Sequence, residues 1–246
     1  MKRYGWEIFF GVSMLVLSFV FYFVHYVVFK DSHHIFIFLI GDIAFVFFEV
    51  LLVSMIIHQL LSMRERRARL EKLNMVIGTF FSRVGTKLLA YISDYDPNLE
   101  MIRKKLIITN DWSDQDFSRV SKGLKNQKYG VDIQNVKLEE FRTFLVGEID
   151  FLLRLMESPT LLEHEAFTEL LMAVFHLSDE FAAREDMSNL PATDSAHIAG
   201  DIKRVYVLLV REWLQYMKHL KDNYPYLFSL AVRTNPFDQS ASVIVM

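Results

Sequence analysis

The pattern of apolar and polar residues divides the chain into an apolar first part and an amphipathic second part. The stretch from Trp6 to Phe29 carries one charged side chain, Glu7, close to its start. A second apolar stretch, Ile35 to Leu61, carries only Asp42 and Glu49. A helix of about 20 apolar residues crosses a bilayer. The sequence therefore predicts two membrane spans, at about 6–29 and 35–61.

Basic residues predict how these spans are oriented. Only Lys30 and the four residues 31–34 separate the spans, so we expect an antiparallel hairpin over residues 1–61. Lys2 and Arg3 precede the first span, the segment Arg64–Lys72 follows the second, and the turn region has only Lys30. Because basic residues favour the cytoplasmic side, both termini are expected in the cytoplasm. The first span is too long for the apolar region of a signal peptide, which predicts a multi-pass protein of the inner or plasma membrane.

A basic segment follows the second span. Residues 62–91 contain seven basic and two acidic side chains, whereas residues 92–246 contain 17 basic and 24 acidic ones. Basic residues next to a span are attracted to anionic lipid headgroups. We expect that contact from Arg64, Arg66, Arg67 and Arg69.

The two acids of the second span share one face of the helix. Asp42 and Glu49 are seven residues apart, which brings them within about 20° of each other around the helix. The first span carries polar residues within a similarly narrow arc, at Ser18, Tyr22 and His25. A carboxylate facing lipid costs about 2.5–3.5 kcal/mol. This face is therefore expected to meet protein or water.

Three interpretations of these intramembrane polar residues remain open. In the first, the acids are neutral, are hydrogen-bonded to Ser, Tyr or a backbone carbonyl, and hold the hairpin or its oligomer together, with Tyr22 or His25 as a possible partner of Asp42. In the second, several copies of the chain arrange the acids around a cation pore. In the third, the acids relay protons together with His25 or His58. The pore ranks above the relay because His58 lies about 180° from Glu49 around the helix.

A helical stalk is expected over residues 62–96. Apolar residues repeat there at a spacing near 3.5, at Leu70, Leu73, Ile77, Phe80, Val84 and Leu88. This seam fits a short coiled coil, or a helix that packs on its own domain. The second interpretation is slightly favoured because the repeat is short.

The remaining residues predict a bundle of helices over 97–232 and a tail over 233–246. Ser113-x-x-Asp116 resembles a capping box that opens a helix to about Lys125, and Thr160-x-x-Glu163 resembles a second one. The periodicity predicts further helices over 136–158 and 194–223. The fold class is therefore all-α: a two-span transmembrane hairpin continuing through a helical stalk into a cytoplasmic helical bundle.

Composition removes several classes of function. The chain has no Cys, which excludes disulfides, thiolate metal sites and cysteine nucleophiles. A net charge of −3 does not suggest a nucleic-acid partner. No phosphate-binding loop, dinucleotide fingerprint or nucleophile elbow is present. We therefore rank an enzyme third, below a channel and a membrane-anchored interaction module.

Histidine and carboxylate pairs are the remaining candidate chemistry. His176 and Glu180 are four residues apart, and so are His197 and Asp201, with Glu148 on the preceding predicted helix. Adjacent helices carrying such pairs can bind zinc, iron or manganese. However, His176 and Glu180 lie opposite the apolar face of their helix, where a solvated surface is expected. No cofactor is predicted, and a transition metal is kept as an alternative.

The leading functional hypothesis is an oligomeric integral membrane protein, a cation channel or channel-like protein with a cytosolic sensing or gating domain. Two spans rarely form a pore alone, so this hypothesis requires a homo-oligomer. One alternative is a membrane-anchored interaction or signalling module that uses the hairpin as a tether. Another is a metal-binding helical bundle.

Overall fold

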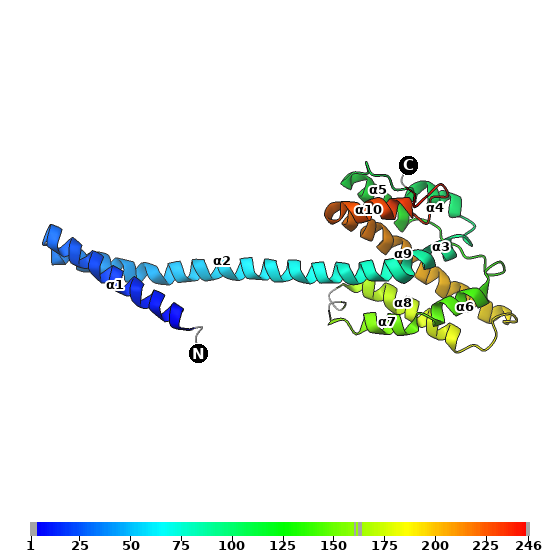
Figure 1. Ribbon diagram of the computed structural model, residues 1–246, viewed down its shortest axis with the longest axis horizontal. Coiled ribbons are helices and arrows are strands. Elements are labelled where there is room, and N and C mark those ends of the chain that lie inside the picture. Colours follow the sequence, from blue (N-terminus) through cyan, green and yellow to red (C-terminus); the bar gives the residue numbers. More distant parts are fainter. Residues whose placement is uncertain (1–3, 160, 162–163, 245–246) are drawn as a thin grey trace. The chain divides into compact units, whose positions relative to one another are not determined.

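The computed structural model describes residues 4–159, 161 and 164–244. Every regular element in this part of the chain is a helix, which confirms the predicted all-α class. The chain divides into two compact units, Met1–Arg66 and Arg67–Met246 (Figure 1). Each unit is described by itself below.

The first unit consists of α1 (Tyr4–Phe29) and the beginning of α2 (Ser32–Phe80). Only Lys30 and Asp31 connect them, so the chain reverses direction after α1 (Figure 1). Lys30 adopts the left-handed region with φ of 51°. Asp31 Oδ1 accepts a hydrogen bond from the His34 amide at 3.1 Å, which satisfies a backbone donor at the start of α2. The expected four-residue connection is therefore wrong, because its last three residues join α2.

The apolar residues of the first unit do not form a core. Two helical segments, Ile8–Phe29 and the one beginning at Ser32, are long and apolar enough to cross a membrane by length and composition. No residue in the apolar window of either segment is buried within the chain. Phenylalanines such as Phe19 and Phe47 are largely exposed. Apolar surface on this scale marks a region that contacts a partner or a membrane.

The second unit begins with the last part of α2, a π-helical turn η1 (Phe81–Gly85) and α3 (Thr86–Ser93). The predicted apolar seam is buried here from Leu73 to Leu88, whereas Leu70 is exposed. The interpretation of a helix packed on its own domain is therefore confirmed from Leu73 onward. Gly85 is required by this packing. A Cβ there would lie 2.7 Å from ring carbons of both Phe80 and Phe81.

Helix α9 is the centre of the second unit. It contacts α3, α5, α8 and α10, while α6 and α7 pack on α8. The helices that follow α3 are α4 (Leu99–Leu106), α5 (Asp114–Lys125), α6 (Leu138–Val146), α7 (Ile149–Met156), α8 (Glu165–Ala182), α9 (Ala192–Asn223) and α10 (Pro225–Arg233). This arrangement places one face of α8 directly against α9.

The helix boundaries match the sequence in some places and not in others. The capping box at Ser113 and Asp116 is confirmed, with both reciprocal hydrogen bonds formed. The single helix expected over 136–158 is wrong, because Gly147 and Glu148 separate α6 from α7. Thr160 and Glu163 of the second capping box lie outside the described residues. Helix α8 begins instead after His164, whose Nδ1 accepts a hydrogen bond from the Phe167 amide at 3.1 Å.

Candidate functional site

In the first unit, the two acids of the apolar stretch have no partner in the described part of the chain. Asp42 and Glu49 are both exposed on α2, and neither forms a hydrogen bond or ion pair with a described residue. Ser18, Tyr22 and His25 together line a hollow on α1. His25 Nδ1 is buried and makes no hydrogen bond. The structure therefore does not bring Tyr22 or His25 into hydrogen-bond contact with Asp42.

The basic residues after this stretch are exposed on α2. Arg67 Nε forms an ion pair with Glu71 Oε1 at 3.3 Å, one helical turn further on. Such an exposed pair contributes little to stability. All four residues predicted to contact headgroups, Arg64, Arg66, Arg67 and Arg69, are exposed.

The second unit brings two predicted pairs of residues together. Helix α8 carries His176 and Glu180, helix α9 carries His197 and Asp201, and the two helices face each other. We call these four residues the His–carboxylate cluster. His176 Nε2 lies 3.5 Å and His197 Nε2 lies 3.3 Å from Asp201 Oδ2. His176 Nε2 is also 3.9 Å from Glu180 Oε1, and His197 Nε2 is 3.7 Å from Glu180 Oε2.

The carboxylates of the His–carboxylate cluster are more buried than its imidazoles, which extend toward solvent. Asp201 is only 3% exposed, and its Oδ2 atom makes no hydrogen bond. The side chains of His176 and His197 are 46% and 51% exposed. The helical periodicity of the sequence thus identified the solvated side of α8, on which His176 lies. The periodicity did not predict that Asp201 is buried beneath His176.

Two arginines surround the cluster. Arg184 Nη1 donates to Glu180 Oε2 at 2.6 Å, and Arg184 Nη2 donates to Asp194 Oδ1 at 2.6 Å. These hydrogen bonds hold the pKa of both Glu180 and Asp194 below the usual range, against the opposing effect of desolvation. Arg204 Nη1 lies 3.2 Å from Asp201 Oδ1. Each carboxylate of the cluster therefore has one oxygen paired with an arginine.

Glu148 does not join the cluster. It lies at the start of α7, where its Oε2 accepts a hydrogen bond from Arg83 Nε at 2.7 Å. The Arg83 guanidinium in turn lies 4.6 Å from the centre of the Phe151 ring. This arrangement indicates that Glu148 positions α7 against η1.

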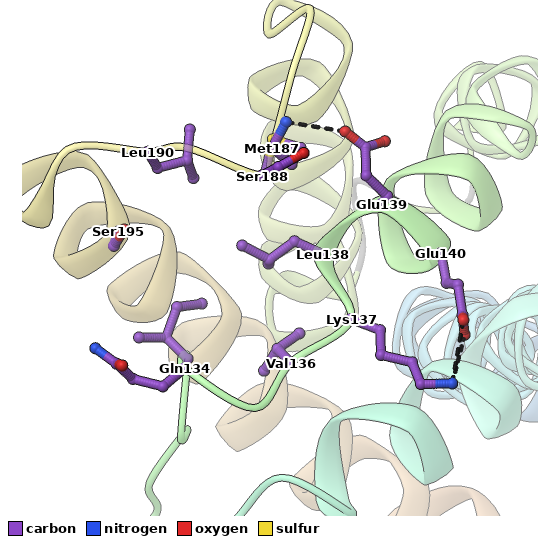
Figure 2. A pocket seen from close by; sticks show the side chains of 11 residues that line it. Gln134, Val136, Lys137, Leu138, Glu139, Glu140, Met187, Ser188, Leu190 and Ser195 are labelled. Atoms are coloured by element: carbon purple, nitrogen blue, oxygen red, sulfur yellow. Dashed lines mark hydrogen bonds and ion pairs between the residues drawn. The ribbon is translucent and has the colours of Figure 1, made fainter.

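A separate cavity of about 450 Å³ lies beside the start of α6 (Figure 2). Glu139 and Met187 are on its rim, where Glu139 Oε1 accepts a hydrogen bond from the Met187 amide at 2.9 Å. Lys137 Nζ pairs with Glu140 at 3.1 Å on the other side (Figure 2). Glu139 Oε2 also pairs with Arg142 Nη1 at 3.4 Å, so Lys137, Glu139 and Glu140 all have a partner of opposite charge. The cavity therefore presents no unpaired charge with which to select a ligand.

Glu212 is a buried acid that the sequence reasoning missed. It is 2% exposed on α9, and burial raises the pKa of its carboxyl to about 7. Its Oε1 accepts a hydrogen bond from Gln215 Nε2 at 3.3 Å. The spacing from Leu209 through Glu212 to Tyr216 is the three-and-four repeat of a core seam. That spacing could have identified Glu212.

Comparison with known proteins identifies relatives over both units. Residues 69–233 match the family described as "Uncharacterized protein MJ1433, C-terminal helical domain", and residues 2–61 match "MJ1433, N-terminal helical domain". The chain is 47% identical over 243 residues to "Uncharacterized protein MJ1433" of Methanocaldococcus jannaschii. That alignment covers 99% of this chain and 97% of the relative. No solved structure matches the chain.

Proposed function

The chain belongs to the MJ1433 family of proteins with two helical domains, and from this premise we propose that it is a homo-oligomeric membrane protein that conducts cations. In this proposal residues 1–61 form a transmembrane hairpin in the inner or plasma membrane. Residues 62–96 leave the membrane as a stalk, residues 97–232 form a cytosolic sensing or gating domain, and residues 233–246 are a tail.

One observation carries the proposal: Asp42 and Glu49 are exposed on an apolar helix and have no partner among the described residues. Facing lipid, each would cost about 2.5–3.5 kcal/mol when charged. Copies of the chain arranged around an axis would turn this shared face toward water instead of lipid. Rings of carboxylates of this kind select cations over anions.

The exposed apolar surface supports a membrane location. Both helical segments of the first unit are long and apolar enough to span, and their apolar windows are not buried within the chain. The exposed arginines of α2, among them Arg64 and Arg67, would lie at anionic headgroups. With Lys2 and Arg3 at the other end, this distribution of charge favours cytoplasmic termini.

The test compares charge removal with side-chain removal. Asp42→Asn together with Glu49→Gln keeps the size and hydrogen-bonding capacity of both groups but removes their charge. We expect this double variant to assemble with the same number of copies in detergent. In liposomes it should lose most of the cation flux, or the selectivity for cations over anions. Flux is measured with an ion-sensitive dye, and copy number by light scattering.

A matched control and a contradicting outcome define the result. Asp31→Asn removes an acid from the turn of the same unit, and it should leave flux unchanged. Wild-type flux from the Asn/Gln variant, together with a dissociated Asp42→Ala, Glu49→Ala variant, would reject the pore in favour of interhelical hydrogen bonds.

A second candidate is a membrane-anchored interaction module. The observation that favours it is the second unit, which has a continuous buried core of its own from Leu73 to Phe237. A wild-type protein that is monomeric and conducts no ions would support this tethered module.

A further inference from the structure

We propose that the His–carboxylate cluster binds one divalent transition metal ion of the zinc type between α8 and α9. This site goes beyond the proposed channel and does not depend on it, because all its ligands belong to the second unit. The four ligands are His176, Glu180, His197 and Asp201.

The imidazole–carboxylate separations within the cluster are those of ion pairs, are longer than most hydrogen bonds, and are close to the spacing of ligands around one metal ion. An N–H···O hydrogen bond spans about 2.7–3.2 Å. The imidazole Nε2 atoms lie 3.3 and 3.5 Å from Asp201 Oδ2, and 3.9 Å separates His176 Nε2 from Glu180 Oε1. Two ligands on a tetrahedral zinc ion, each bonded at about 2.0–2.2 Å, are about 3.3–3.6 Å apart. Of the four imidazole–carboxylate separations, the two to Asp201 fall in this range, and the two to Glu180, at 3.7 and 3.9 Å, are longer.

A buried oxygen that accepts no hydrogen bond provides a second observation. Asp201 is 3% exposed, yet its Oδ2 atom makes no hydrogen bond and faces the two imidazoles. A buried acceptor without a donor is costly, and native structures nearly always satisfy such groups. A cation bound to Oδ2 would supply the missing partner.

The surrounding arginines prepare the carboxylates for this role. Arg204 pairs with Asp201 Oδ1, which leaves Oδ2 for the metal. Arg184 binds Glu180 Oε2 and is held in turn by Asp194, which leaves Glu180 Oε1 for the metal. Partners on the second oxygen of a carboxylate orient the first oxygen toward its ion.

Binding requires the two imidazoles to move. As they stand, no three or more such side chains in the described ranges are arranged to hold a metal ion. The carboxylates are fixed by Arg184 and Arg204, whereas the His176 and His197 side chains are about half exposed and can rotate. The ion would draw both rings inward onto Asp201 and Glu180.

The chemistry of the ligands and their number indicate which ion binds and what it does. Two imidazole nitrogens with two carboxylate oxygens favour zinc and its neighbours over magnesium or calcium, which prefer oxygen alone. Four protein ligands fill a tetrahedral shell and leave no position for a substrate. The ion therefore acts as a structural clamp that joins α8 to α9.

The test uses the full chain in detergent after removal of metal with a chelator. Zn²⁺ is titrated against a competing chromophoric chelator, and Co²⁺ is added separately to report coordination through its visible absorption. We expect one equivalent of Zn²⁺ per chain, intense tetrahedral Co²⁺ bands and a higher Tm with zinc. Because the chain has no Cys, thiolates cannot contribute to either readout.

Variants localise the binding. His176→Ala and His197→Ala change partly exposed side chains and should keep the fold, as checked by circular dichroism, while weakening zinc binding at least tenfold. His58→Ala removes an exposed histidine of α2 and serves as the matched control, with unchanged affinity. The proposal is overturned if the wild type takes up no zinc at micromolar concentration, or if one equivalent binds equally well to both cluster variants.

Discussion

Helices α2 and α9 each carry two carboxylates among apolar residues, but the two pairs of carboxylates have opposite environments. On α9, Asp201 and Glu212 are buried, and each has a neighbour that pairs with it, Arg204 or Gln215. On α2, Asp42 and Glu49 are exposed and have no partner among the described residues. Within α9, buried acids are thus paired with side chains of their own helix. Within α2, no described residue pairs with the two acids.

The same contrast holds for the aromatic residues. Phe80 in the second unit is fully buried, and its ring centre lies 5.3 Å from that of Phe81 and 5.5 Å from that of Phe167. Phe47, in the first unit, is largely exposed. One unit therefore has a core that stabilises its fold, whereas the other unit presents its apolar residues outward. Substitutions at Phe80 and Glu212 test this difference, and one at Ser113 tests a local feature of the second unit.

The largest expected effect is on the core. Phe80→Ala should reduce the free energy of unfolding of the second unit by about 3–5 kcal/mol, because it leaves a cavity among packed rings. Phe47→Ala, the matched control, should change it by less than about 0.5 kcal/mol. Chemical unfolding of the full chain in detergent, followed by the fluorescence of buried Trp213, measures both. Equal losses from the two variants would contradict the contrast between the units.

A smaller effect concerns the buried acid of α9. Burial raises the pKa of Glu212 from 4.5 to about 7, with Arg211 opposing the shift and Glu169 adding to it. Between these two pH values the folded chain keeps a proton that the unfolded chain releases. The free energy of unfolding should therefore fall as pH rises through this window, by roughly 2–3 kcal/mol in total.

Variants assign this pH dependence to Glu212. Glu212→Gln should remove most of the fall between pH 4.5 and 7, because the amide does not ionise. Glu169→Gln, an exposed acid on α8, should keep most of it. Unfolding curves recorded at several pH values measure the slope, and an unchanged slope in Glu212→Gln would show that another group is responsible.

The smallest effect concerns a helix start. Ser113→Ala should cost about 1 kcal/mol, because its side chain accepts a hydrogen bond from the Asp116 amide at the start of α5. Ser118→Ala, at an exposed position inside the same helix, should cost nothing measurable. Thermal unfolding distinguishes the two variants. Because capping is a local interaction, this effect does not depend on the buried core of the second unit.

The sequence by itself determined the features that depend on near neighbours in the chain. Uninterrupted apolar residues identified the two long helical segments, and the charges after Leu61 identified the basic segment. The capping box at Ser113 located the start of α5, and the apolar periodicity located the end of α9 at Asn223. These features follow from periodicity and from backbone hydrogen bonds within a few residues, so one segment contains all the information that they need.

Only the tertiary structure decided how separate helices meet. The spacing in α8 and α9 paired His176 with Glu180 and His197 with Asp201, but it could not predict that both pairs face each other. It also could not predict that Asp201 and Glu212 are buried, since α9 is covered on several sides by α3, α5, α8 and α10. The rotation of one helix against another is set by the packing of side chains distant in sequence. Periodicity along a single helix contains no information about that rotation.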